Sequence, residues 1–223
     1  KVISKSSLFS IRLLQNFFSS SYITDRLLNL AEKFDKLKDN GTIQRELFIS
    51  LLRFSFVERL LPEKGKLNSL VKYYEELKIG VGWLKFDPHF WLQYGMARMN
   101  YGQLDKAQSN LDEAYVLARN KQHYDTSYLD TQQARLFILK SLDESENDGK
   151  IVWDYFQKAH NLLRVLDDNV YKYRQVATYK RFFENKYNVL SKKNKENFTI
   201  AVTQMKNNLE NSTYFNPSSV FSD

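Results

Sequence analysis

The chain has 223 residues, 43% of them hydrophobic and 15% aromatic, which is enough to bury a sizeable core in one large or two small domains. Its 7 glycines and 3 prolines are too few for the many turns of an all-β protein, so a mainly helical fold is predicted. Cysteine is absent, which excludes disulfides and thiolate metal sites, and the net charge of +7 comes from residues 171–206, a basic segment.

Apolar residues at helical spacing predict four helices in the first part of the chain. Their stripes contain Leu8, Ile11, Leu14 and Phe18; then Leu27, Leu30, Ala31 and Phe34; then Leu47, Leu51, Phe54 and Val57; and finally Leu67, Leu70, Val71, Tyr74 and Leu77. The second helix is expected to begin near Thr24 and to end at Asp39-Asn40-Gly41, and Leu61-Pro62 ends the third. Residues 80–87 are the weakest joint.

The segment from Asp87 to Arg119 carries a regular pattern of large and small residues. Asp87 and Pro88 suit the start of a helix, and the pattern continues with Trp91, Tyr94, Gly95, Gly102, Ala107, Leu111 and Ala114. These spacings resemble those of a tetratricopeptide repeat. Small residues such as Gly95 and Ala107 would let two antiparallel helices touch. The segment departs from the family pattern at Arg98, where the family has Tyr, and at Arg119, where it has Pro.

A second, degenerate hairpin is predicted from residues 128–142 and 150–166, with Ala134, Val152, Phe156 and Ala159 at the repeat positions. Two further helices are expected, one carrying Tyr173 to Leu190 and one over residues 195–208. The predicted fold is therefore all-α, a right-handed stack of antiparallel helix pairs, or tetratricopeptide-like α-solenoid. Its parts are N-terminal hairpins (1–84), tetratricopeptide-like hairpins (85–167), basic helices (168–210) and a poorly ordered tail (211–223).

A longer resemblance covers residues 53–142. Its motifs are Arg53-Phe54-Ser55, Leu60-Leu61-Pro62, Tyr73-Tyr74-Glu75, the run from Asp87 to Tyr94, Tyr124-Asp125-Thr126 and the run from Asp130 to Arg135. This order is similar to the C-terminal helical region of large bacterial anti-phage defence proteins that carry sirtuin-like or STAND NTPase modules. The resemblance implies a sensor or scaffold role. Because the chain begins at Lys1 rather than Met, we expect it to be a piece of a longer protein.

Two sets of side chains are candidates for partner binding. The first would line the inner, concave face of the stack: Gln93, Arg98, Asp130, Gln133 and Arg135. On the segment 128–135, polar residues stand where a helix should enter a core, and a hydrogen-bonded brace between hairpins is the equal alternative. The second set is a basic face: Lys172, Arg174, Lys180, Arg181, Lys186, Lys192 and Lys193. Aromatic residues are interleaved with these cations, so the basic face could bind single-stranded nucleic acid. A solvated helix face is the favoured interpretation, and docking of an acidic protein is a further alternative.

No constellation for catalysis is found in the sequence. His89, His123 and His160 lack a second ligand at metal-binding spacing and are interpreted as structural or surface residues, and no phosphate-binding glycine loop is present. We therefore expect no enzyme activity, metal or cofactor in this chain. The sequence predicts a cytoplasmic protein-interaction domain without a membrane span, its partner being a protein or peptide, either phage-derived or another domain of the same protein. The chain could also assemble into oligomers, and nucleic-acid binding is the alternative function.

Overall fold

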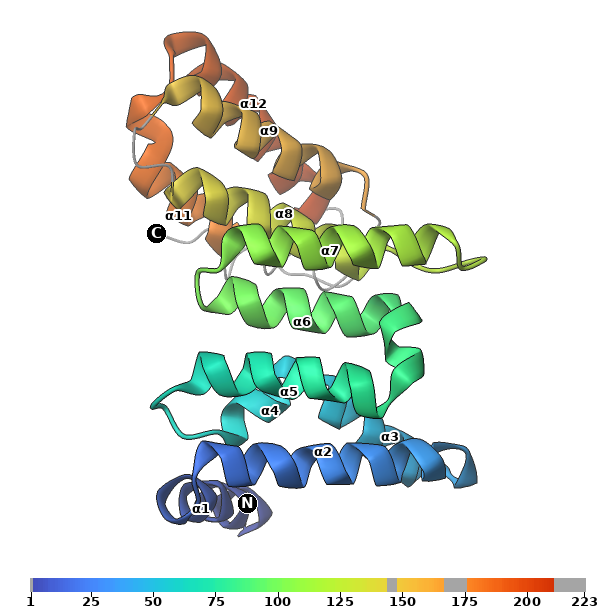
Figure 1. Ribbon diagram of the computed structural model, residues 1–223. Helices are drawn as coiled ribbons and strands as arrows, with labels where there is room; N and C mark the ends of the chain where they lie inside the picture. Colours follow the sequence, from blue (N-terminus) through green and yellow to red (C-terminus); the bar gives the residue numbers. More distant parts are fainter. Residues whose placement is uncertain (1, 144–147, 167–175, 211–223) are drawn as a thin grey trace. The chain divides into compact units, whose positions relative to one another are not determined.

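A computed structural model describes residues 2–143, 148–166 and 176–210 (Figure 1). The α-helices are α1 (Val2–Phe17), α2 (Ser20–Leu37), α3 (Thr42–Leu52), α4 (Phe54–Leu60), α5 (Lys66–Gly80), α6 (Pro88–Asn100), α7 (Leu104–Arg119), α8 (Ser127–Asp143), α9 (Gly149–Arg164), α11 (Val176–Lys186) and α12 (Lys192–Glu210). The described residues also form the short 3-10 helices η1 (Lys38–Asn40), η2 (Gly82–Phe86) and η3 (Tyr187–Val189). The described residues contain no strand, which confirms the all-α prediction. In these ranges, no helix has the length and apolar character that crossing a bilayer requires.

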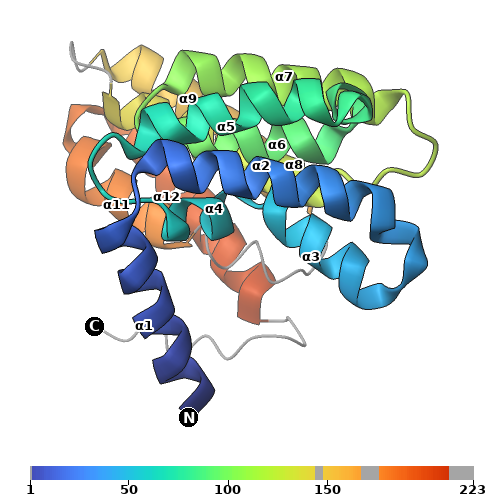
Figure 2. The ribbon, with the colours of Figure 1, turned by 60° about the horizontal axis from the view of Figure 1, so that its bottom comes forward.

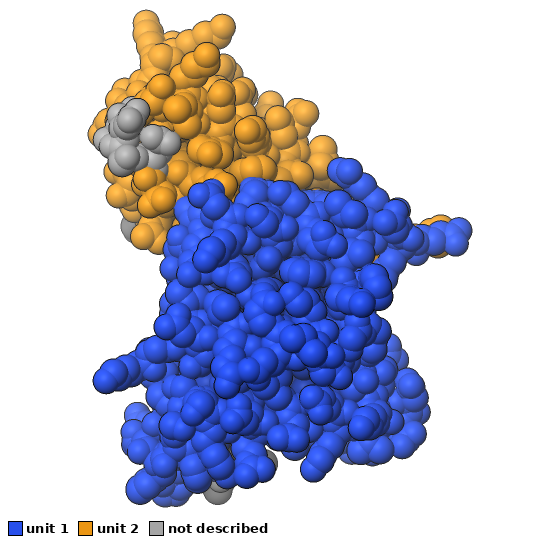
Figure 3. Space-filling model, viewed as in Figure 1, with its two compact units in different colours: residues 1–122 blue, residues 123–223 orange. Residues whose placement is uncertain are grey.

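The chain divides into two compact units, residues 1–122 and residues 123–223, which Figure 3 colours separately. This division differs from the boundaries expected from the sequence. The expected boundary at residue 84 lies inside unit 1, because η2 buries Leu84 and the preceding Val81 in the core. The expected hairpin segment 85–167 contributes to both units. The tail from residue 211 lies outside the described residues.

In unit 1, four long helices pack in succession: α2 against α5, α5 against α6, and α6 against α7. Figure 1 shows α5, α6 and α7 alternating in direction, while α3 and α4 return the chain from the end of α2 to the start of α5. Helix α1 runs at a steep angle to α2 (Figure 2) and packs on α4. The Gln15 side-chain amide fixes this contact by donating to the carbonyls of Arg59 (2.9 Å) and Leu61 (3.2 Å) at the end of α4.

The third predicted helix is divided into α3 and α4 at Arg53. The backbone of Arg53 is extended, with φ −73° and ψ 120°, and its N–H donates to the Ser50 carbonyl. Two buried tyrosines of α5 take up the carbonyls that end α3: the Tyr73 hydroxyl donates to Leu51 (2.9 Å) and the Tyr74 hydroxyl to Leu52 (2.8 Å). The single-helix prediction was therefore wrong, because hydroxyls from α5 replace the helical hydrogen bonds of this turn.

The closest helix approach in the predicted repeat is between α6 and α7. A Cβ atom placed on Gly95 would lie 2.9 Å from Leu111 Cδ2 and 3.4 Å from the Ala107 carbonyl oxygen, so a larger residue does not fit unless Leu111 moves. Ala107 and Leu111 are fully buried. Gly102, with φ +73°, makes the turn between the two helices. The small residues therefore serve the close contact that their spacing predicts.

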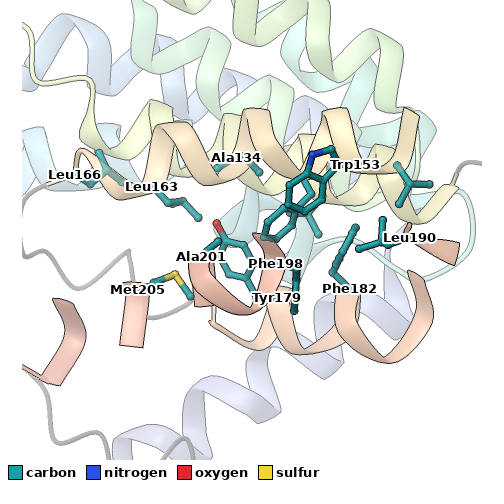
Figure 4. Packing of buried hydrophobic residues seen from close by; sticks show 14 residues of the cluster. Ala134, Trp153, Leu163, Leu166, Tyr179, Phe182, Leu190, Phe198, Ala201 and Met205 are labelled. Atoms are coloured by element: carbon teal, nitrogen blue, oxygen red, sulfur yellow. The ribbon is translucent and has the colours of Figure 1, made fainter. Parts of the chain in front are cut away.

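Unit 2 is built on the paired helices α8 and α9, with α11 packed on α8 and α12 on α9. Its core contains Ala134 of α8, Phe156 and Ala159 of α9, Phe182 of α11 and Phe198 of α12, all buried (Figure 4). The Phe156 ring lies 4.9 Å from that of Phe182 and 4.8 Å from that of Phe198, measured between centroids. These aromatic contacts join helices that are far apart in the sequence.

Of two predicted helix starts, the one near Thr24 was wrong and the one at Asp87-Pro88 was confirmed. Helix α2 begins at Ser20 and is capped by the Ser19 hydroxyl, which accepts from the Tyr22 N–H at 3.2 Å. Thr24 instead lies inside the helix and donates to the Ser20 carbonyl. Asp87 does stand at the N-cap of α6, but its carboxylate makes no cap hydrogen bond and pairs with Lys121 at 3.0 Å.

Candidate interaction surfaces

Gln93 of α6, predicted to face a partner, is buried, with 4% of its surface exposed. Its Oε1 accepts a hydrogen bond from the Phe54 N–H at 3.2 Å, and its Nε2 lies 3.4 Å from His89 Nε2. Phe54 is the first residue of α4, so Gln93 satisfies one of the backbone donors that a helix start leaves without an intrahelical partner. Gln93 therefore braces the start of α4 against α6. The contacts that Tyr73, Tyr74 and Gln93 make on either side of Arg53 are called the α3–α4 joint below.

Arg98 lies one turn further along α6 and is held by its neighbours. Its guanidinium stacks 4.5 Å from the centroid of the Tyr94 ring, and one of its nitrogens donates to Gln103 Oε1 at 2.7 Å while another donates to the Tyr94 hydroxyl. That hydroxyl in turn donates to Glu75 Oε1 at 2.8 Å. Arg98 therefore joins α6 to the turn before α7 and, through Tyr94, to α5.

The electrostatics of this network centre on Glu75. Burial alone would raise the pKa of its carboxyl, but hydrogen bonds from Lys78, at 2.7 Å, and from Tyr94 outweigh burial and lower it. The pKa of the Tyr94 hydroxyl is raised by burial and by its bond to this carboxylate. A charged Glu75 thus anchors a neutral tyrosine, which suits a structural network better than proton transfer near neutral pH.

The other three predicted inner-face residues lie on α8, in unit 2. Asp130 is in the first turn, where its carboxylate accepts from the Thr126 hydroxyl at 2.8 Å and so closes the start of the helix. Gln133 is 4% exposed, and the adjacent Gln132 is also buried. Arg135 is half-buried, and burial lowers the pKa of its guanidinium. Gln133 is therefore inaccessible, whereas Arg135 keeps part of its surface in solvent.

The predicted basic face is smaller than expected. Lys172 and Arg174 lie outside the described residues, and Lys186, the last residue of α11, is buried, with 7% of its surface exposed. Four cations are exposed as predicted: Lys180 and Arg181 on α11, and Lys192 and Lys193 at the start of α12. Lys186 should therefore be removed from the set.

The aromatic residues of the basic segment divide into two classes. Tyr179, Phe182 and Phe198 are buried in the core of unit 2, as their helical spacing predicts. Phe183 is 49% exposed beside the cations of α11, and its ring lies 4.7 Å from that of Tyr187. Lys195 in turn lies 5.3 Å from the centroid of the Tyr187 ring. Proteins that bind single-stranded nucleic acids combine exposed aromatic side chains with exposed cations in this way.

A groove between α9 and α12 was not anticipated from the sequence. It has a volume of about 150 Å³, and its polar lining consists of Gln157, His160 and Asn161 of α9 and Asn197 and Gln204 of α12. Within the described parts of the chain, these five side chains make no hydrogen bond to protein groups. The spacing of Gln157 and Asn161 is visible in the sequence, but no local pattern predicts that α12 faces them.

The described residues hold no group of three histidine or carboxylate side chains that could bind a metal ion. Burial lowers the pKa of both His89 and His160, which keeps these imidazoles neutral near pH 7. Comparisons with protein-family models, curated proteins and solved structures gave no match to this chain. The function is therefore inferred from the geometry of the two units and from the sequence resemblance.

Proposed function

We propose that this chain is a non-catalytic protein-interaction domain whose helix pairs are repeats of a right-handed, tetratricopeptide-like α-solenoid. The observation that carries the proposal is the close contact of α6 and α7, where Gly95 faces Leu111 with no room for a Cβ atom between them. That contact uses the positions at which tetratricopeptide repeats place small residues. Paired helices that each need a neighbour to bury their faces favour a scaffold rather than a catalytic fold.

The biological setting we propose is bacterial antiviral defence, with the chain as the sensor or scaffold part of a larger cytoplasmic protein. The support is the order of motifs over residues 53–142. Several of these motifs meet at one place: Phe54, Tyr73, Tyr74 and Gln93 all contribute to the α3–α4 joint. The partner would be a protein or peptide, either phage-derived or another domain of the same protein.

The test is affinity capture with the purified chain, from bacteria with and without phage infection, followed by titration of each purified candidate. We expect saturable binding with a Kd tighter than about 0.1 mM. A partner that binds unit 1 should no longer bind Gly95→Leu, which separates α6 from α7, and should still bind Gly82→Ala, where a Cβ atom meets nothing within 4 Å. If no captured protein binds saturably, the proposal fails.

Single-stranded nucleic acid is the second candidate partner, because Phe183 is exposed beside Lys180 and Arg181. The measurement is a titration with single-stranded RNA and DNA at several salt concentrations. Each phosphate contact contributes about 0.7 to the slope of log K against log salt. Reversing Lys180, Arg181, Lys192 and Lys193 to Glu should then reduce the slope by up to about 3. An unchanged slope, or no binding at low salt, would exclude this use of the basic face.

A further inference from the structure

The groove between α9 and α12 has walls of unusual composition. Four of its polar side chains are carboxamides and the fifth is an imidazole, so no charged group lines it. A carboxamide offers both a hydrogen-bond donor and an acceptor, and a neutral imidazole does the same through its two nitrogens. The His160 ring is neutral near pH 7 because burial, with the nearby Arg164 charge, lowers its pKa. The walls thus present uncharged donors and acceptors in equal measure.

The floor of the groove is apolar. Trp153 and Phe156 lie at its base with little exposed surface, and the Phe156 ring stacks against that of His160, with the planes 7° apart. Ile200 of α12 lines the groove and is 55% exposed. A ligand that fits these surfaces combines uncharged hydrogen-bonding groups with an apolar side chain, which describes a peptide segment.

The carboxamide spacing also suits an extended chain. Gln157 and Asn161 are four residues apart on α9, which separates them by about 6 Å along the helix axis. Two residues of an extended strand span about 6.6 Å, and a strand turns the same edge of its backbone outward every second residue. One wall can therefore bond backbone groups two residues apart on one edge of a peptide, while Asn197 and Gln204, about 10.5 Å apart along α12, reach the other edge at two separate points.

Charge distinguishes this ligand from a nucleic acid. Lys158, next to Gln157 in the sequence, and Lys195, two residues before Asn197, lie over aromatic rings that are not part of the groove. The cations one turn beyond the lining are Arg164 on α9 and Lys193 on α12, and neither lines the groove. A phosphate backbone would therefore meet neutral walls, whereas an uncharged peptide backbone needs no cation, so the lining favours a peptide.

We propose that the α9–α12 groove binds an extended peptide segment, its backbone held by the carboxamides of Gln157, Asn161, Asn197 and Gln204 and one apolar side chain placed over Ile200. The proposal rests on the proposed protein-interaction function and names the form in which the partner is recognised. Recognition of backbone groups makes the groove tolerant of sequence apart from the apolar position.

The probe is a displayed library of short random-sequence peptides, selected on the full chain. The test variant is Gln157→Glu combined with Asn197→Asp, which keeps the side-chain shapes but replaces two donors by charged acceptors. Both positions are exposed, and circular dichroism checks that the fold is kept. Gln122→Glu is the matched control, because Gln122 is exposed in the segment between α7 and α8 and outside the groove. Side-chain amide resonances of labelled Asn and Gln provide a second readout.

We expect enriched peptides to share one apolar position, to lose affinity by about tenfold or more in the double variant, and to change by less than about twofold in the control. Peptides that bind equally well to the double variant would overturn the groove assignment while leaving the interaction function intact. Enrichment of no peptide would also overturn it, and capture of a folded partner would then decide the broader function. If single-stranded RNA displaces the peptides and does not bind to the double variant, the groove would be assigned to nucleic acid instead.

Discussion

The α3–α4 joint provides the sharpest test of how this fold is held together. Replacing Tyr73 or Tyr74 by Phe removes a single hydroxyl and leaves the rest of the ring in the core. Each hydroxyl donates to a carbonyl at the end of α3, and both tyrosines are fully buried, so water cannot replace the lost donor. Leaving a buried carbonyl without its partner costs about 1–2 kcal/mol.

We therefore expect Tyr73→Phe and Tyr74→Phe each to lower the free energy of unfolding of unit 1 by about 1–2 kcal/mol. Gln93→Leu should cost about 1–3 kcal/mol, because it leaves the Phe54 N–H without an acceptor. The two tyrosine rings lie 5.6 Å apart, so the double variant Tyr73→Phe/Tyr74→Phe need not be additive.

Urea unfolding followed by tryptophan fluorescence measures these changes. In a Trp153→Phe background the signal comes from Trp83 and Trp91, both in unit 1, so the transition of that unit is observed alone. The control is Tyr22→Phe, since Tyr22 is 43% exposed and its change should stay within about 0.5 kcal/mol. If the variants at positions 73 and 74 change stability no more than this control, the hydroxyls do not hold the joint, and another cause must be found for the break between α3 and α4.

Two further predictions concern packing and pH. Gly95→Leu should destabilise unit 1 by about 2 kcal/mol or more, because Leu111 and the Ala107 carbonyl leave no space for the larger side chain. Gly82→Ala should be neutral or slightly stabilising. Thermal unfolding compares the two variants, and equal melting temperatures would contradict the close contact of α6 and α7. The free energy of unfolding should also fall as the pH drops below about 6.5, because burial holds the folded-state pKa values of His89 and His160 below the unfolded value and the unfolded chain therefore takes up protons first. Urea midpoints measured between about pH 7.5 and 5 test this, and His89→Gln should make their fall with pH less steep. An unchanged slope in that variant would count against the effect.

The helices themselves could be read from the sequence because their signals are local. The turn at Asp39-Asn40-Gly41, the end of α5 at Gly80 and the start of α6 at Pro88 all lie where the pattern places them. Each depends on residues within a few positions of the boundary. The α6–α7 contact was predictable for a related reason, since the repeat pattern encodes the small residues of both helices.

The break between α3 and α4 could not be read in this way. The apolar spacing continues through Arg53 without interruption, and the groups that stabilise the break come from α5 and α6, much later in the chain. The same reason explains why the internal contacts of polar positions could not be predicted. Gln93 is polar, as a binding residue would be, but its carboxamide accepts from the Phe54 N–H, which no local pattern brings near it.

Polar side chains that already bond to the protein are poor candidates for holding a partner, because a partner would have to compete with satisfied internal bonds. By this criterion the inner-face set is weakened: Gln93 and Asp130 have internal partners, and Arg98 is bound to Tyr94 and Gln103. The carboxamides of the α9–α12 groove differ from this set. They are exposed and uncharged and form no hydrogen bond within the described chain, so a partner has only solvent to replace. Within the described residues, the search for the binding surface of this domain should therefore begin at that groove.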